Sequence, residues 1–141
     1  ATSRPPRVSD QPSSATTDVR PLAAALHEEA ALRAALFEAT TECVVLLEPD
    51  GRLVAVNAAG CALLRAPREA ALVGRAWATL WDDEGRRVAH AALERALAGG
   101  VARFQARCVA LDGAAHRVDV TLSPIRGDDG RVVRLLLVAR D

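Results

Sequence analysis

The chain has 141 residues, which suits one domain that removes about 70% of its unfolded surface from water. Its 18 basic and 18 acidic side chains cancel, so no broad field attracts nucleic acid or an anionic membrane. No apolar run approaches the roughly 20 residues of a membrane-spanning helix, and no secretory signal is recognised, so we expect a cytoplasmic protein. The cysteines Cys43, Cys61 and Cys108 are far apart in apolar sequence, which predicts reduced core thiols.

The first forty residues divide into two segments. Residues 1–20 are rich in Ser, Thr, Pro and Arg, and this composition predicts a flexible tail. Residues 21–40 begin with Pro21 and continue with Ala, Leu and Glu, which predicts a helix that links or dimerises domains. We expect residues 41–141 to form the folded domain that follows this helix.

A hairpin is the clearest local prediction. Two short apolar runs, 43–48 and 53–57, are joined by Pro-Asp-Gly-Arg, where Pro presets φ and Gly accepts a positive φ. Asn57 ends the second run, and its side chain is expected to cap a short helix over 58–64. Further short helical pieces follow, including 76–81.

The second half contains one longer helix and three strands. The helix is predicted over 84–98, with an apolar stripe of Val88, Ala91, Ala92, Leu93 and Leu97. Alternation then predicts strands whose inner residues are Phe104, Ala106 and Cys108, followed by Val118, Val120 and Leu122. The last strand, 132–139, is apolar on both faces, so we expect both to be covered, one of them by the helix at 21–40.

Three phrases of the sequence resemble PAS domains: EPDGRLVAVNAAGCALL at 48–64, ALVGRAWATLW at 71–81 and HRVDVTLSPIRGDDGRVVRLLLVARD at 116–141. The resemblance runs from about residue 36 to residue 141. It implies an α+β fold with a five-stranded antiparallel sheet in the order 2-1-5-4-3. Short helices would close a cavity on one face, and the N-terminal helix would cover the other.

The resemblance also implies a function in bacterial signalling. PAS domains commonly belong to histidine kinases, cyclic-dinucleotide enzymes or transcription regulators, where they sense a ligand or partner for an output domain of the same polypeptide. We therefore expect no catalysis by this domain itself. Ser123, His116 and Asp119 do not form a catalytic set, because Asp119 and Ser123 share one strand face and His116 lies on the other.

The sequence does not match the motifs by which PAS sensors bind their known cofactors. We therefore expect no cofactor and no metal. Haem-binding relatives take their axial ligand from the long helix, but the matching position falls at Val88 or Ala89, so His90 is expected to be a solvated surface residue. The Asn-Cys-Arg motif of flavin-cysteine photosensors is absent. Non-covalent flavin stays open, because Trp77 and Trp81 lie in the segment that walls the cavity in flavin-binding relatives.

The main functional hypothesis is a sensor for a small, mainly apolar ligand. The candidate lining residues are Val45, Leu47, Asn57, Leu64, Trp77, Leu80, Trp81, Val88, Ala92, Phe104, Ala106, Arg107, Val118, Val120, Leu122, Leu135 and Leu137. Asn57 is expected to serve mainly as a cap, and Arg107 at a strand edge would reach a carboxylate. The alternative is a ligand-free interaction and dimerisation module whose own side chains fill the cavity.

A homodimer is expected to carry the signal. Leu136 and Val138 point away from the inner face, so the second face of the last strand would be an exposed apolar patch without a cover. The residues assigned to this face and to the dimer are Leu22, Leu26, Leu32, Leu36, Phe37, Leu136, Val138 and Asp141. Within this set, residues 32, 36 and 37 would cover the patch in one chain, while residues 22 and 26 would meet a second chain. By the resemblance, Asp141 starts the output linker.

Overall fold

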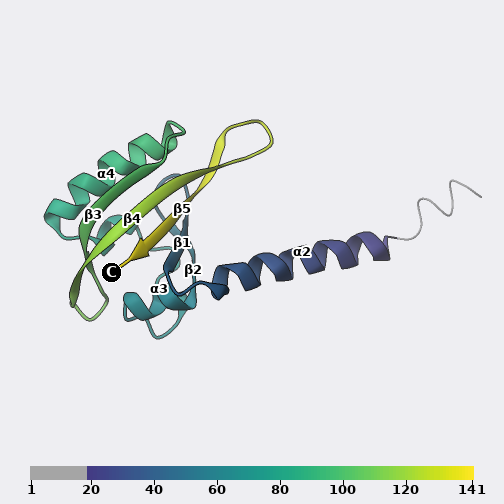
Figure 1. Ribbon diagram of the computed structural model, residues 1–141, viewed down its shortest axis with the longest axis horizontal. Helices are drawn as coiled ribbons and strands as arrows, with labels where there is room; N and C mark the ends of the chain where they lie inside the picture. The colour runs from purple at the N-terminus through teal and green to yellow at the C-terminus, as the bar shows by residue number, and fades with distance from the viewer. Residues whose placement is uncertain (1–18) are drawn as a thin grey trace, which may run out of the picture. The chain divides into compact units, whose positions relative to one another are not determined.

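A computed structural model describes residues 19–141, so most of the tail predicted at 1–20 lies outside the described residues. The residues up to Leu36 and the residues from Phe37 onward form two units, which we describe one at a time (Figure 1). The elements, in chain order, are α2 (Arg20–Ala39), β1 (Cys43–Leu47), β2 (Leu53–Val56), α3 (Ala58–Leu63), η1 (Glu69–Ala71), η2 (Trp77–Leu80), α4 (Asp83–Leu97), β3 (Ala102–Val109), β4 (Ala115–Arg126) and β5 (Val132–Arg140).

One antiparallel sheet organises the second unit. Its strands lie in the order β2-β1-β5-β4-β3, so the first hairpin sits beside the last strand (Figure 1). Register follows the alternation in the sequence: Val120 pairs with both Phe104 and Ala139, which puts three inner-face residues side by side. The α+β fold class and the strand order implied by the resemblance are confirmed.

The β1–β2 hairpin forms as predicted. Gly51 has φ 89°, a conformation that glycine adopts without strain, and its N–H donates to the Glu48 carbonyl at 2.9 Å. The Glu48 N–H donates to the Arg52 carbonyl at 2.8 Å and closes the turn. Asn57 caps α3 by accepting from the Gly60 N–H at 2.8 Å, which is also as predicted.

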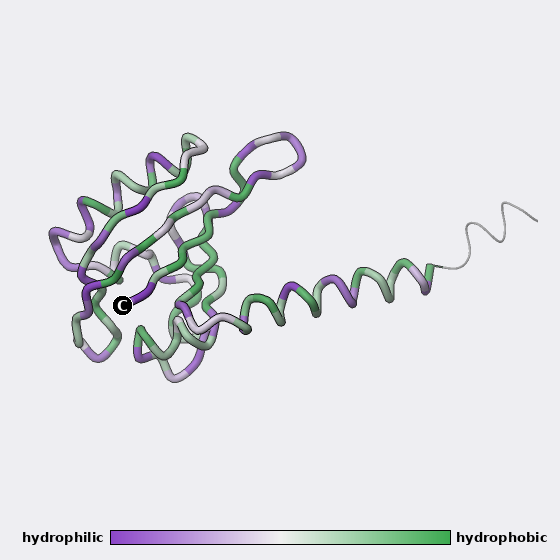
Figure 2. Tube along the Cα trace, viewed as in Figure 1, coloured by the Kyte–Doolittle hydropathy of each residue, from purple (hydrophilic) through white to green (hydrophobic). Residues whose placement is uncertain are grey.

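The core lies on the inner face of the sheet. Leu47, Leu122 and Leu135 are completely buried there, and β1 and β5 form its most apolar part (Figure 2). In β3 and β4 buried residues alternate with exposed ones, as the sequence predicts for strands with one solvated face. Packing of this inner face is the main source of stability for the unit.

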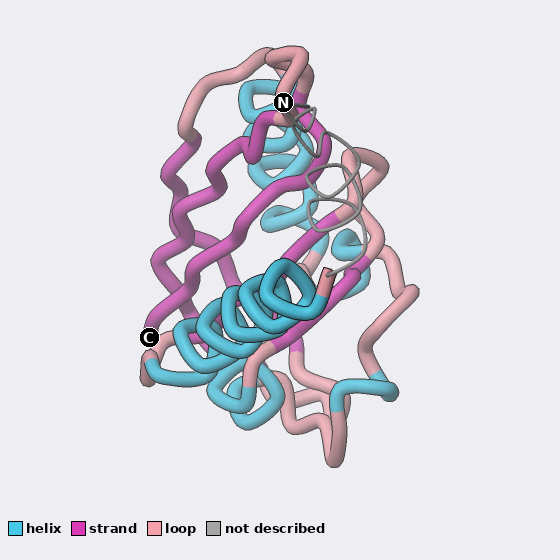
Figure 3. Tube along the Cα trace, turned by 90° about the vertical axis from the view of Figure 1, so that its right-hand side faces the viewer, coloured by secondary structure: helices cyan, strands magenta, loops and turns pink. Residues whose placement is uncertain are grey.

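Helix α4 packs along β3 and β4, but not by the face that the sequence predicts (Figure 3). Its buried residues are Gly85, Ala89, Ala92 and Ala96, whereas Val88 and Leu97 are exposed. Small side chains face the sheet because the helix approaches it closely: a Cβ on Gly85 would lie 3.4 Å from the Cβ of Ala106. The predicted stripe is therefore correct at Ala92, which is buried, and at Leu93, which packs against the core, but wrong at Val88, Ala91 and Leu97.

The outer face of the sheet is apolar along β1 and β5. Val44 lies beside Val138 and Leu46 beside Leu136, and apart from the buried Val44 these side chains are half-buried. Helix α2 contains no buried residue. The predicted packing of Leu32 and Leu36 on this face stays a prediction, because these leucines belong to the first unit and the face belongs to the second. None of the helices among residues 19–141 is long and apolar enough to cross a membrane.

Candidate functional site

Three aromatic side chains form a cluster at one end of the core. Trp77 and Trp81 belong to η2 and the residue after it, and Phe104 comes from β3. The ring centroids are 5.6 to 6.5 Å apart, and all three pairs are edge-to-face. Backbone contacts hold both tryptophans in place. The backbone N–H of Trp77 donates to the Gly51 carbonyl at 2.8 Å, and Trp81 forms an isolated β-bridge with Cys108 of β3.

The indole N–H of Trp81 is the one buried side-chain polar group among the described residues that lacks a hydrogen-bond partner. Trp81 is 4% exposed, so its indole N–H lies away from bulk solvent. A buried unpaired donor destabilises a protein by about 1–3 kcal/mol. The cluster therefore combines an apolar surface with a single donor that an incoming acceptor would satisfy.

Most of the residues assigned to a pocket come together in the core. The buried ones are Val45, Leu47, Leu64, Trp77, Leu80, Trp81, Ala92, Ala106, Val118, Val120, Leu122, Leu135 and Leu137. Phe104 is half-buried and packs against the same cluster. These residues belong to one continuous hydrophobic core on the inner face of the sheet.

Two assigned residues do not join this interior. Val88 is 38% exposed, because α4 turns its alanines rather than its valine toward the sheet. Arg107 is exposed on the outer side of β3, since its neighbours Ala106 and Cys108 occupy the inner side. A carboxylate bound in the core would therefore not meet Arg107.

Asn57 is a structural hub rather than a pocket wall. Its Oδ1 accepts from the N–H of Val44 at 2.9 Å and from the N–H of Gly60 at 2.8 Å. Its Nδ2 donates to the carbonyls of Phe37 and Glu42, each at 3.0 Å. These four bonds use both donors and the acceptor of the side chain, so nothing remains for a ligand. Asn57 instead ties β1, α3 and the segment before β1 together.

The three thiols are not set up for nucleophilic chemistry. Burial raises the pKa of Cys43 to about 12, with smaller contributions from Cys108 and Cys61. Burial also raises the pKa of Cys108 to about 11, with a smaller contribution from Asp141. Cys61 is only half-buried, yet burial and then Glu69 and Glu38 raise its pKa as well. Because the thiolate is the reactive form, all three are unreactive at neutral pH.

His90 does not face the core. Its side chain is 73% exposed, and Nε2 lies 3.2 Å from Oε1 of Glu94, one turn further along α4. The inward position beside it belongs to Ala89. His90 thus occupies the solvated surface position that the sequence predicts. Among residues 19–141, no group of three or more His, Cys, Asp or Glu side chains has the arrangement of a metal site.

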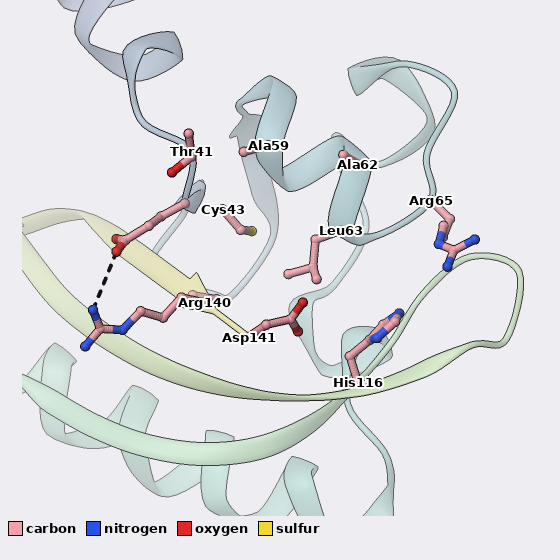
Figure 4. A pocket seen from close by; sticks show the side chains of 11 residues that line it. Thr41, Cys43, Ala59, Ala62, Leu63, Arg65, His116, Arg140 and Asp141 are labelled. Atoms are coloured by element: carbon pink, nitrogen blue, oxygen red, sulfur yellow. Dashed lines mark ion pairs between the residues drawn. The ribbon is translucent and has the colours of Figure 1, made fainter.

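A surface pocket of about 580 Å³ lies between α3 and the end of β5 (Figure 4). Its floor contains Cys43, Ala59 and Leu63, and its rim is charged. Arg65, His116 and Arg140 lie on this rim together with Glu42 and Asp141, and Arg140 Nη1 is 3.7 Å from Glu42 Oε1. Positive and negative groups alternate around the opening, so no charge class of ligand is favoured. Sequence reasoning missed this pocket because its residues come from four separate segments.

Comparison with known proteins agrees with this architecture. The family model of the PAS fold matches residues 37–141. A PAS domain of an HTR-like protein from Haloarcula marismortui has 25% identity and a TM-score of 0.70, over 86% of this chain and 98% of that one. A domain of a sensory box sensor histidine kinase/response regulator from Geobacter sulfurreducens has 22% identity and a TM-score of 0.68, over 82% and 96%.

A PAS domain from Colwellia psychrerythraea is similar too, with 19% identity and a TM-score of 0.71 over 78% of this chain and 93% of that one. No curated protein sequence matches the chain. The antiparallel sheet with short helices on its inner face is the architecture of the PAS fold. The chain belongs to the PAS family, whose members generally act as non-catalytic sensory modules.

Proposed function

We propose that the domain is a sensor for a small, mainly apolar molecule that carries one hydrogen-bond acceptor. The observation that carries this proposal is the buried, unpartnered N–H of Trp81 beside Trp77 and Phe104. A carbonyl or hydroxyl oxygen of the ligand would accept from this N–H while its apolar part packs on the three rings. The signal would pass to an output domain of the same polypeptide, for which the histidine kinase relative from Geobacter is the model.

Thermal melting with a panel of small aromatic carbonyl and hydroxyl compounds tests this proposal. A ligand present at about 100 times its Kd should stabilise the protein by about 2.7 kcal/mol. In Trp81→Phe the shift should largely disappear, because the donor is gone. Trp77→Phe is the matched control, since it trims the same cluster and leaves the Trp81 N–H in place. An equal shift in Trp81→Phe and wild type would refute the assigned role of the donor.

An absorption spectrum of the purified protein is the companion measurement. A Soret band would indicate haem, and the absorption bands of flavin would indicate a flavin held by the aromatic cluster. Either result would show that the bound ligand is a coloured cofactor and not the small apolar molecule that we propose. We expect neither band.

The alternative is a ligand-free interaction module, and the packing of the core favours it. Leu47, Leu122 and Leu135 have no exposed area, so side chains of the domain already fill the space beside the sheet. Five surface hollows of about 200 to 580 Å³ lie among the described residues, and neither Trp77 nor Trp81 lines any of these five. A panel that shifts neither wild type nor Trp77→Phe would support this alternative.

We further propose that α2 forms a dimer through its leucine stripe. At about 100° per residue, Leu22, Leu26, Leu32 and Leu36 fall within an arc of about 120°. Leu22 and Leu26 are 62% and 56% exposed, so no side chain among residues 19–36 covers the stripe. Glu29 and Arg33 lie in the middle of the arc and pair at 3.0 Å, and a polar pair inside an apolar seam can fix the register of two helices.

Replacing Leu22 and Leu26 with glutamine should weaken this dimer. Burying one leucine contributes about 1.5–3 kcal/mol, and two copies of each are lost, so the dissociation constant should rise by at least about tenfold. Sedimentation equilibrium measures the change, and a chain that lacks residues 1–31 should behave as a monomer at the same concentration. Dimerisation of the shortened chain that is as tight as that of the intact chain would rule out α2 as the dimer element.

A further inference from the structure

The two edge strands of the sheet are protected to different degrees. At the β2 edge, the Leu53 N–H donates to the Arg75 carbonyl at 2.9 Å, and the Leu53 carbonyl accepts from the Gly74 N–H at 2.8 Å. The Val56 N–H donates to the Glu69 carboxylate at 3.3 Å. The segment between α3 and η2 therefore closes the β2 edge against pairing with another chain.

The β3 edge is closed only at its two ends. The Arg107 carbonyl accepts from the Asp82 N–H at 3.2 Å, and the Val101 carbonyl accepts from Arg95 Nε at 2.9 Å. Backbone groups of alternate residues point the same way in an antiparallel ladder, so those of Arg103 and Gln105 also point away from β4. Neither residue has a backbone partner on that side among residues 19–141. The edge thus presents a two-residue slot with four free backbone groups.

A groove follows this slot. One hollow of about 460 Å³ lies between α4 and residues 101–104, and a second of about 300 Å³ lies between α4 and residues 105–107. Val88 lines both hollows, so they meet at its side chain. Val88 and Val101 are 38% and 41% exposed, which gives the groove an apolar wall that the domain itself does not cover.

Unpaired positive charge surrounds the same slot. Arg107 of β3 lies directly opposite Arg117 of β4, and like charges in this position destabilise a sheet. Within the described residues, neither they nor Arg103 forms an ion pair with a carboxylate. The acids that line the two hollows are Asp82, which caps α4, and Glu84. The arrangement is complementary to an acidic partner.

We propose that the β3 edge binds a short extended segment of a partner protein in which acidic and apolar residues alternate. The segment would pair with the free N–H and C=O groups of Arg103 and Gln105 and so extend the sheet by one strand. Side chains of a strand point alternately to its two faces. Its acidic side chains would therefore meet Arg103, Arg107 and Arg117, while its apolar ones would enter the groove at Val88.

A different reading of the same arginines is that they guard the edge against unwanted pairing. Protection of the edge would explain the charged side chains on β3. It would not explain the apolar groove beside the slot, or the two closed ends that limit the slot to two residues. A guarded edge should bind no strand at all. The two readings therefore predict opposite results in a binding experiment.

The test uses the full chain and a synthetic peptide of about seven residues that alternates glutamate and valine, with blocked termini. Amide hydrogen exchange followed by NMR should show that the Arg103 and Gln105 N–H groups become protected by at least about tenfold when the peptide is added. A second peptide carries N-methyl groups on the amides that would pair with the edge. It should bind at least about tenfold more weakly, because it cannot donate these hydrogen bonds.

A charge-reversed protein completes the test. Arg103→Glu/Arg107→Glu should lose binding by at least about tenfold, and added salt should weaken binding to the wild type. Arg68→Glu/Arg131→Glu is the matched control, since it makes the same change in net charge at exposed arginines away from β3. The proposal is overturned if the peptide does not bind, or if the N-methylated peptide binds equally well. It is also overturned if the two amides become protected with rising protein concentration alone, because a second copy of the chain would then occupy the edge.

Discussion

Replacing Asn57 with alanine should lower the free energy of unfolding by about 3–5 kcal/mol, because it removes a helix cap and leaves one further buried group and two partly buried groups without this partner. The groups affected are the Val44 N–H and the carbonyls of Phe37 and Glu42, in addition to the Gly60 N–H at the start of α3. Urea unfolding followed by far-UV circular dichroism measures the change.

Asp82→Ala is the matched control for this prediction. Asp82 caps α4 through the same type of bond, from the Gly85 N–H at 2.8 Å, but it holds no second element. Its loss should therefore destabilise the protein by only about 1 kcal/mol. If the two alanine variants lose equal stability, Asn57 is an ordinary helix cap and the hub assigned to it does not exist.

Local signals in the sequence predicted the parts of the fold that depend on neighbouring residues. Pro49, Asp50 and Gly51 sit between two apolar runs, and this turn chemistry allows little except a hairpin. The alternation around Val118 and Val120 likewise assigned the inner face of β4 correctly, because one face of that strand is solvated. The order of the strands came from the family resemblance, since local patterns do not determine which strands pair across the sheet.

The face of α4 was not predictable from hydropathy alone. Val88 and Leu97 are more apolar than alanine, so a hydropathy stripe turns them inward. In the structure Ala89, Ala92 and Ala96 are the buried residues instead, because a helix that carries small side chains can approach the sheet more closely. The spacing of these residues with Gly85 was the signal that would have found this face.

The candidate sites show the same limit. Most of the assigned core residues could be chosen by strand alternation, and they do share one interior. The unpartnered N–H of Trp81 could not be predicted, because it depends on which hydrogen bonds all the neighbouring polar groups form in the folded protein. The open slot at Arg103 and Gln105 depends in the same way on contacts with Asp82 and Arg95, which lie on other elements.

Gly51→Ala should destabilise the domain by about 2–5 kcal/mol, the second large effect that we expect. At φ 89° an alanine is strained by about 1–2 kcal/mol. Its Cβ would also lie 2.8 Å from Cδ1 of Trp77, a buried side chain whose backbone N–H donates to the Gly51 carbonyl at 2.8 Å. Gly74 has the same φ of 89° with no heavy atom within 4 Å of its Cβ, so Gly74→Ala should show the strain alone.

A double-mutant cycle separates the clash from the strain. In a Trp77→Leu background the indole ring is absent, so Gly51→Ala should then cost about 1–2 kcal/mol, close to Gly74→Ala in the wild type. The difference between the two backgrounds is the contact energy between the hairpin turn and the aromatic cluster. Tryptophan fluorescence reports the same contact, because both tryptophans of the chain lie in that cluster. An equal loss for Gly51→Ala in both backgrounds would show that the turn does not press on Trp77, and the hairpin could not then transmit a change in the cluster to β1 and β5.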